Sequence, residues 1–360
     1  MEYYLFISND CNLNCKYCSI LLNQRQLNVP IEPIYSLFDL QNFIDATQKK
    51  YNDNIADIIL FGGEPTLNYT FIEKLIQMQK SLNDLAYEIH YMLHTNGLLL
   101  YKISDYILNN IDSIMLSINY DKVPRIRLDS GYFKNIIDSV HYIKQKRNIP
   151  IVARLTITEV TSLYSEISLF NPFFDAVYWQ IENKYDFNNF EEFYNTYKFE
   201  LNLVFELWMK YLEFGIFLRF IPFIASVNFL SENIKPKIFC CGYNNSMIYI
   251  QTDGKCYTCA EDLTTNKNLV GSINTDFKFS NFNLLDTLCN ECPYLVMCKG
   301  RCGRMHKEFT PEHVKNYCKL NTILFDLIKS NYEKIIHLYN KYNIPNDLKD
   351  PIFHYTEYTP

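Results

Sequence analysis

Short apolar runs alternate with amphipathic stretches through the first half of this 360-residue chain. Apolar runs of four to eight residues predict buried strands, and apolar residues three or four apart predict helices. Alternating strands and helices are typical of βα units on a parallel sheet. We expect strands at residues 3–8, 55–61, 86–93, 113–118, 151–156 and 176–181, and helices at residues 36–51, 70–82, 104–110 and 133–146.

Six strands in about 180 residues predict an α/β fold, a partial (β/α)6 TIM-like barrel rather than a closed eight-stranded one. The chemistry of such a fold lies at the carboxyl ends of its strands. We expect this core at residues 1–185, then a helical bridge at 186–239 whose residues 190–211 form one long amphipathic helix. A small cysteine-rich domain at 240–322 and a C-terminal helix and tail at 323–360 would follow, with the helix at 323–342.

Charge and hydropathy along the chain argue against nucleic-acid binding, membrane insertion and secretion. The net charge is -6 and the Lys and Arg residues are scattered, so nucleic acid is not an expected partner. No apolar run reaches about 18 residues, so we expect no membrane span. No basic segment precedes an apolar run at the N-terminus, as a secretory signal would require. Clustered thiols without such a signal favour a reducing compartment, the cytoplasm.

Three of the twelve cysteines, Cys11, Cys15 and Cys18, follow the first predicted strand with CX3CX2C spacing. Isolated cysteines are more often small core residues or half of a disulfide. Three thiols within eight positions of a short polar loop are typical of a metal site. Three thiolates are an incomplete ligand set for a 4Fe-4S cluster, so one iron would stay open to a chelating molecule.

Polar residues follow several of the other predicted strands. A Gly-Gly pair allows close backbone approach to a ligand, a glutamate accepts hydrogen bonds from an ammonium group, and an arginine holds a carboxylate with two parallel bonds. Each feature alone is weak, but their shared position at strand ends predicts one site. The residues are Gly62, Gly63, Glu64, Pro65, Thr95, Asn96, Ser117, Asn119 and Arg154.

The cysteine loop followed by Gly62-Gly63-Glu64-Pro65 resembles the radical S-adenosylmethionine (radical SAM) superfamily over roughly residues 1–185. The resemblance implies that the open iron chelates the methionine moiety of S-adenosylmethionine and that an electron from the cluster yields a 5′-deoxyadenosyl radical. It also implies roles for site residues. Gly63 and Glu64 would contact the methionine amino group, Arg154 its carboxylate, Ser117 and Asn119 the ribose or carboxylate, and Tyr17 the adenine. Relatives often carry Ser-X-Asp-Gly where this chain reads Ser117-Ile118-Asn119-Tyr120.

The other nine cysteines lie between Cys240 and Cys318. Their CX2C pair also suits tetrahedral zinc, so a zinc ribbon is the alternative to iron–sulfur clusters. The full string resembles the SPASM extension of radical SAM peptide-modifying enzymes, which implies two auxiliary 4Fe-4S clusters. By position, Cys289, Cys292, Cys298 and Cys318 would bind the distal cluster, and Cys259, Cys302 and one or both of Cys240 and Cys241 the nearer one. Cys256 is either a further ligand or an unliganded thiol.

The resemblance implies an oxidoreductase that matures a ribosomally synthesised peptide by thioether or carbon–carbon crosslinking, or by epimerisation. Sulfatase-maturating relatives, which form formylglycine, carry an acid directly after the cysteine matched by Cys259. This chain has Ala260 there, so that branch remains an alternative. A non-catalytic iron–sulfur electron carrier is the alternative from another class.

The expected partners are a peptide, a separate leader-binding protein, and an electron donor of the flavodoxin or ferredoxin type. The sequence assigns no catalytic acid or base. Four further polar residues are either substrate contacts or solvated surface, with surface the expectation: Gln180, Glu182, Asp186 and Arg219. His306 and His313 are expected to be ordinary surface or core residues.

Overall fold

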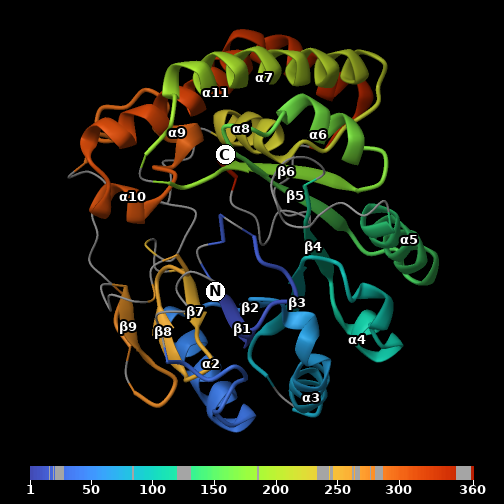
Figure 1. The fold of residues 1–360 in the computed structure, drawn as a ribbon, viewed down its shortest axis with the longest axis vertical. Helices are drawn as coiled ribbons and strands as arrows, with labels where there is room; N and C mark the ends of the chain where they lie inside the picture. Colours follow the sequence, from blue (N-terminus) through green and yellow to red (C-terminus); the bar gives the residue numbers. More distant parts are fainter. Residues whose placement is uncertain are drawn as a thin grey trace. The chain divides into compact units, whose positions relative to one another are not determined.

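The computed structural model describes two compact units (Figure 1). The first comprises residues 1–117, 124–151 and 241–281, and the second residues 118–123, 152–240 and 282–360. Each unit combines segments that are far apart in the sequence, so the four predicted segments stay a prediction. The described residues are 1–15, 17, 18, 20, 28–82, 85–119, 131–184, 186–232, 243, 246–261, 263, 268–275, 277–279, 287–345 and 358–360.

The first unit is built on seven strands in the order β4-β3-β2-β1-β7-β8-β9. The five neighbouring strands β4, β3, β2, β1 and β7 are parallel, and β8 and β9 continue the sheet as antiparallel neighbours. The four predicted strands of this unit are confirmed to within two residues. The strands are β1 (Glu2–Ser8), β2 (Ile55–Gly62), β3 (Glu88–Thr95), β4 (Ser113–Ser117), β7 (Met247–Ile250), β8 (Lys255–Tyr257) and β9 (Leu269–Ser272).

Strand β1 lies at the centre of this sheet, between β2 and β7. Its residues from Tyr3 to Ser8 are all buried, which explains a continuous rather than alternating apolar run. The predicted helices are also confirmed, and serine side chains cap two of them: Ser36 accepts from Asp39 N and Ser104 from Ile107 N. The helices are α2 (Leu37–Tyr51), η1 (Pro65–Asn68), α3 (Tyr69–Lys80), η2 (Leu100–Lys102), α4 (Asp105–Asn110) and α5 (Gly131–Lys146).

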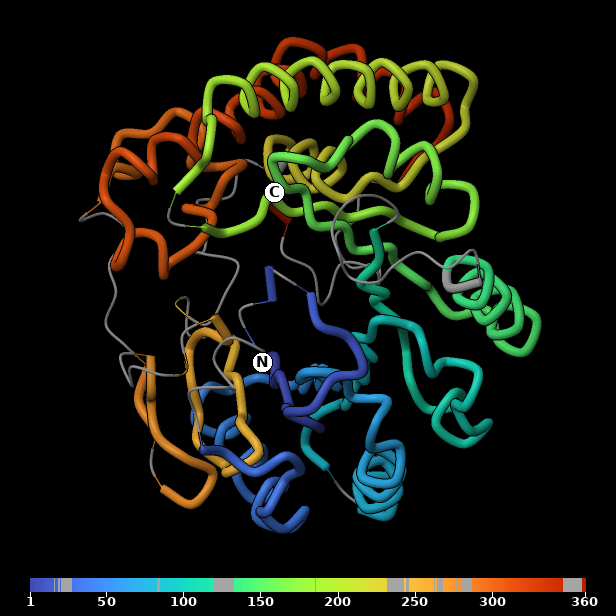
Figure 2. Tube along the Cα trace, viewed as in Figure 1, coloured from blue at the N-terminus to red at the C-terminus, as the bar shows by residue number. Residues whose placement is uncertain are grey.

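In the second unit, β5 (Ile151–Ile157) and β6 (Ala176–Ile181) pair in parallel. The buried Trp179 donates from Nε1 to Tyr197 Oη at 3.2 Å, which ties β6 to α7. Figure 2 shows α7 and α11 running side by side. The helices are α6 (Leu163–Phe170), α7 (Phe190–Glu213), α8 (Ile221–Glu232), α9 (Leu295–Cys298), α10 (Gly303–Glu308) and α11 (Pro311–Tyr342).

Helix α7 confirms the predicted helix at 190–211, whereas α11 begins twelve residues before the predicted start at 323. The start signal is present in the sequence, because Thr310 caps the helix and Pro311 occupies its first turn. The longer helix therefore includes Cys318. Among the described residues, no helix combines the length and apolar character that crossing a membrane requires.

Candidate iron–sulfur and cofactor site

The CX3CX2C loop leaves the carboxyl end of β1 as a compact turn. The Cys18 N–H donates to Cys15 O at 3.2 Å, and the Leu13 N–H donates to Cys11 Sγ at 3.4 Å. Burial, together with the charges of Glu64, Cys18 and Cys15 and against the hydrogen bond from Leu13, raises the pKa of the Cys11 thiol to about 12. The three thiols lie within eight positions of one loop. They fit a cluster, whose iron would supply the positive charge that keeps thiolates deprotonated.

Gly62 and Gly63 approach the backbone that precedes the cysteine loop. The Gly63 N–H donates to Ser8 O and the Glu64 N–H to Asp10 O, both at 2.8 Å. A Cβ atom at Gly62, where φ is +137°, would lie 2.3 Å from Ser8 O, and one at Gly63 would lie 2.4 Å from Asp10 O. The close approach that requires glycine is thus to the chain's own backbone. A ligand contact by these residues stays a prediction.

The Glu64 side chain is 1% exposed and accepts four hydrogen bonds. Its Oε1 accepts from Thr66 N at 3.1 Å and from the hydroxyls of Thr66 and Thr95 at 2.6 Å, and its Oε2 accepts from Asn96 N at 2.8 Å. Burial raises the pKa of Glu64, while these bonds act in the opposite direction. Glu64 therefore joins the end of β2 to the end of β3, and its contact with an ammonium group stays a prediction.

Asn96 extends this network to the cysteine loop. Its Nδ2 donates to Asn12 Oδ1 at 2.8 Å and lies 3.9 Å from Cys11 Sγ. The structure thus connects the three motifs that the sequence placed at strand ends. Asn12 and Thr66 were missed by sequence reasoning, although both stand beside residues of a motif.

The base of the cysteine loop is held from the opposite edge of β1. Asn9 Nδ2 donates to Thr252 Oγ1 at 2.6 Å and to Pro30 O at 2.8 Å. Thr252 is fully buried just after β7 and donates to the same Pro30 carbonyl at 2.6 Å. No motif marks Thr252 in the sequence, because its role depends on the pairing of β1 with β7. Tyr17, beside the last cysteine of the loop, is half-buried.

The remaining predicted cofactor residues already have partners in the protein. In the first unit, Ser117 Oγ lies 2.9 Å from His94 Nε2. In the second unit, the Asn119 amide donates to Thr156 O at 3.1 Å and accepts from Thr156 N at 3.2 Å, and it is 6% exposed. Asn119 thus continues the backbone pairing beside β5. The ribose contacts of Ser117 and Asn119 stay predictions.

Arg154 projects from β5 toward β6. Its guanidinium donates to Gln180 Oε1 and lies 5.9 Å from the centre of the Tyr178 ring. The side chain is half-buried, so part of it remains accessible to solvent. Its contact with the carboxylate of S-adenosylmethionine stays a prediction.

A second group of thiols forms in the second unit. Burial raises the pKa of Cys298, and the charges of Cys318, Cys289 and Cys292 raise it further. Burial likewise raises the pKa of Cys318 to about 11, with Cys289 and Cys292 adding to the shift. These four thiols are those predicted to hold the distal auxiliary cluster, and their grouping fits a four-cysteine cluster. His306 Nε2 lies 3.6 Å from Cys289 Sγ, so this histidine adjoins the thiol group.

The nearer auxiliary set is described only in part. Cys259 and Cys302 are half-buried, whereas Cys240 and Cys241 lie outside the described residues. Cys256 is fully buried on β8 and its thiol points to Gly254 O at 3.8 Å. Among the described residues, no three His, Cys, Asp or Glu side chains converge on a single metal ion. Thiolates of a 4Fe-4S cluster bind different irons and need no such convergence.

Known proteins resemble this chain in sequence over part of its length and in fold. Residues 5–159 match the radical SAM superfamily. The radical SAM cyclopropyl synthase TigE of Paramaledivibacter caminithermalis is 32% identical over 156 residues, 40% of this chain, which spans only 33% of that relative. A cysteine-type anaerobic sulfatase-maturating enzyme of Clostridium perfringens is 23% identical over 351 residues, 87% of this chain and 91% of that protein.

Two solved structures have the same fold. Native anSMEcpe with bound AdoMet is 18% identical and gives a TM-score of 0.70 over 94% of this chain and 99% of the other. The structure with AdoMet and the Cp18Cys peptide gives 0.68 with the same coverage and identity. These likenesses confirm the α/β radical SAM fold with a cysteine-rich C-terminal part. The match to the family model shows that residues 5–159 form a radical SAM domain.

Proposed function

We propose that this protein is a radical SAM enzyme that oxidises a ribosomally synthesised peptide, with one cluster for S-adenosylmethionine and two auxiliary 4Fe-4S clusters. The second set of cysteines, which includes Cys289, Cys292, Cys298 and Cys318 and lies far along the sequence from the CX3CX2C loop, supports this proposal. A second cluster offers an acceptor for the electron that a substrate radical must lose in a net oxidation. An enzyme without net oxidation has no such need.

The N-terminal cluster, when bound, supplies the electron that cleaves S-adenosylmethionine to methionine and a hydrogen-abstracting 5′-deoxyadenosyl radical. Cys11, Cys15 and Cys18 would hold this cluster. Glu64 and Asn96 position the loop, because their hydrogen bonds link the ends of β2 and β3 to Asn12. Burial keeps water away from that network, since Glu64 and Asn96 are 1% and 7% exposed.

The names of two relatives support a peptide or another carbon-centred substrate. The Clostridium perfringens relative is described as a sulfatase-maturating enzyme and TigE as a radical SAM cyclopropyl synthase. Ala260 occupies the position where the sulfatase-maturating branch would carry an acid. Crosslinking therefore remains our first proposal, with epimerisation beside it, and formylglycine formation is the second.

Iron content and cleavage of S-adenosylmethionine test the cofactor part. After anaerobic reconstitution we expect about twelve irons per chain, the sum of three 4Fe-4S clusters. A strong reductant should then yield 5′-deoxyadenosine. A content of about four irons would exclude the auxiliary clusters, and a chain that forms no 5′-deoxyadenosine would be an electron carrier.

Coexpression with short peptides encoded beside this gene tests the substrate. A crosslink removes two hydrogens, about 2 Da, from a peptide that contains the target residues. Epimerisation leaves the mass unchanged but incorporates solvent deuterium. Omitting a candidate leader-binding protein, or replacing the strong reductant with reduced flavodoxin or ferredoxin, tests the two proposed protein partners. If no neighbouring peptide changes in mass or in deuterium content, peptide maturation is wrong.

A further inference from the structure

The β5–β6 ladder presents a polar row on one of its faces. Side chains alternate along a strand, and the register aligns Arg154 with Tyr178, so these two share a face with Gln180. The contacts of Arg154 with Tyr178 and Gln180 confirm this arrangement. Tyr178 is fully buried, whereas Arg154 and Gln180 are half-buried. The face therefore becomes polar and accessible toward the carboxyl ends of the strands, where α/β folds bind their ligands.

Glu182 is the next residue on that face, two positions beyond Gln180 and just past the end of β6. Its N–H donates to Ile157 O at 2.9 Å, and its carbonyl accepts from the Tyr317 hydroxyl at 2.7 Å. Tyr317 is 1% exposed and belongs to α11. The backbone of Glu182 is thus held from both sides, which fixes the direction in which its side chain leaves the strand. The side chain is half-buried and not the solvated surface residue that the sequence predicted.

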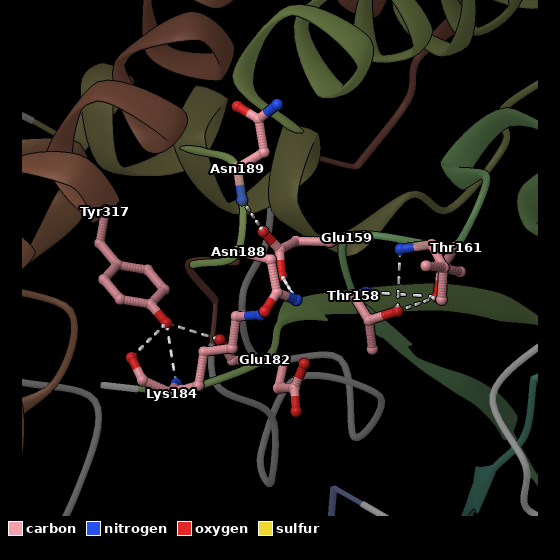
Figure 3. Close-up of polar contacts among 9 residues, drawn as sticks. Thr158, Glu159, Thr161, Glu182, Lys184, Asn188, Asn189 and Tyr317 are labelled. Atoms are coloured by element: carbon pink, nitrogen blue, oxygen red, sulfur yellow. Dashed lines mark hydrogen bonds and ion pairs between the residues drawn. The ribbon is translucent and has the colours of Figure 1, made fainter. Parts of the chain in front are cut away.

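Lys184, whose charge lowers the pKa of Glu182, forms its ion pair with another carboxylate. Lys184 Nζ forms an ion pair with Glu159 Oε2. Glu159 also accepts from Asn188 Nδ2 at 2.9 Å and from Asn189 N at 3.0 Å, so its carboxylate is fully engaged (Figure 3). No dashed line reaches the Glu182 carboxyl group in Figure 3, and among the described residues it has no hydrogen-bond partner.

Burial raises the pKa of Glu182, Lys184 lowers it, and Glu159 raises it. A half-buried carboxylate without a donor is a stronger base than one in water, because its charged form is poorly stabilised. Structural carboxylates in this protein are instead surrounded by donors, as Glu64 and Glu159 are. Glu182 thus has the environment of a group that awaits a donor from a bound molecule.

We propose that Glu182 is a catalytic residue that contacts the peptide and accepts a proton from the group that becomes oxidised or crosslinked. In the crosslinking form, one C–H and one X–H bond break and one C–X bond forms, where X is sulfur, oxygen or nitrogen. The hydrogen atom goes to the adenosyl radical derived from S-adenosylmethionine. The proton goes to Glu182, and the remaining electron goes to an oxidised iron–sulfur cluster. The step therefore balances as a two-electron oxidation.

This inference rests on the proposed peptide oxidation, and three variants test it on the reconstituted full-length protein. Glu182→Gln keeps the shape and removes the basic oxygen, Glu182→Asp keeps the carboxylate, and Glu191→Gln removes an exposed carboxylate on α7 as the matched control. The substrate is the peptide that the wild-type protein modifies on coexpression. The measurements are peptide conversion and peptide-free formation of 5′-deoxyadenosine.

We expect Glu182→Gln to slow conversion by a factor of about 10² to 10⁴, the usual contribution of a positioned base. Peptide-free 5′-deoxyadenosine formation should stay within about twofold of wild type, Glu182→Asp should regain part of the rate, and Glu191→Gln should match wild type. The rise of the wild-type rate with pH should be lost in Glu182→Gln. The other charged or titratable groups around Glu182 are Lys184, Glu159, Arg154, Arg301 and Tyr317.

The outcomes separate the inference from the proposed function. Wild-type conversion together with full conversion by Glu182→Gln would overturn the role of Glu182 alone. Loss of peptide-free 5′-deoxyadenosine formation in Glu182→Gln would also overturn it, because Glu182 would then serve the cofactor and not the peptide. If the wild-type protein cleaves S-adenosylmethionine but modifies no peptide, the proposed function fails first, and this inference falls with it.

Discussion

Replacement of Gly62 by alanine tests how the cysteine loop is held. The added Cβ would lie 2.3 Å from Ser8 O, whereas ordinary contacts begin at 3.4 Å, so the two backbones must separate by about 1 Å. That movement breaks the 2.8 Å bond from Gly63 N to Ser8 O. An unsatisfied buried N–H costs about 1–3 kcal/mol. The backbone at φ +137° adds about 1–3 kcal/mol for a residue with a side chain.

We therefore expect Gly62→Ala to lower the free energy of unfolding by about 2–6 kcal/mol, at the upper end of single substitutions. Urea unfolding followed by circular dichroism measures this loss in the reduced apoprotein. Hydrogen exchange at the Gly63 and Glu64 amides measures its local part, and about 3 kcal/mol corresponds to roughly a hundredfold faster exchange. Iron bound after reconstitution should fall as well, because the displaced backbone leads directly into Cys11.

Gly215→Ala is the matched control. Gly215 also has a positive φ, +75°, but its Cβ would meet a ring carbon of Tyr342 at 2.9 Å, and a side chain can shift where a backbone cannot. We expect a loss of about 1 kcal/mol from the φ value. If Gly62→Ala costs no more than Gly215→Ala, the reasoning from backbone contact is wrong.

Three further predictions concern the pH dependence of stability, the bound iron and a buried hydrogen bond. The Asp57 hydrogen bond raises the pKa of His90, with an Nδ1–Oδ1 distance of 3.1 Å, so stability from this pair is present below about pH 6.5 and lost as pH rises through the raised value. A His90→Gln variant should lose that pH dependence in thermal unfolding, and an unchanged profile would contradict the assignment. Cys298→Ala should lower bound iron by about four per chain whereas Cys256→Ala, at a buried thiol outside the group, should not; equal iron in both would contradict the grouping. Tyr317→Phe removes the hydroxyl at the end of β6 and should cost about 1–2 kcal/mol in urea unfolding, and no loss would show that this hydroxyl does not hold the strand.

The central elements follow from local pattern. Strands β1 to β6 and helix α7 were predicted because their apolar periodicity is strong over many residues. The strands β7 to β9 were not predicted, because runs of three or four residues carry little periodicity and depend on neighbours for their pairing. Helix α11 was predicted too short, although Thr310 and Pro311 are the local signal that marks its start.

Some features of the candidate site could likewise be predicted from the sequence, and others required the tertiary structure. The order and spacing of Cys11, Cys15 and Cys18, followed by the Gly-Gly-Glu-Pro segment, were sufficient by themselves to predict the radical SAM domain at residues 5–159, since both motifs lie within short stretches of chain. Only the tertiary structure showed that the carboxylate of Glu64 is enclosed by donors, while that of Glu182 has no donor among the residues that the structure describes. A glutamate looks the same in any sequence. Its hydrogen-bond partners and exposure come from elements distant along the chain, and those decide whether its charge supports the fold or is available to a substrate.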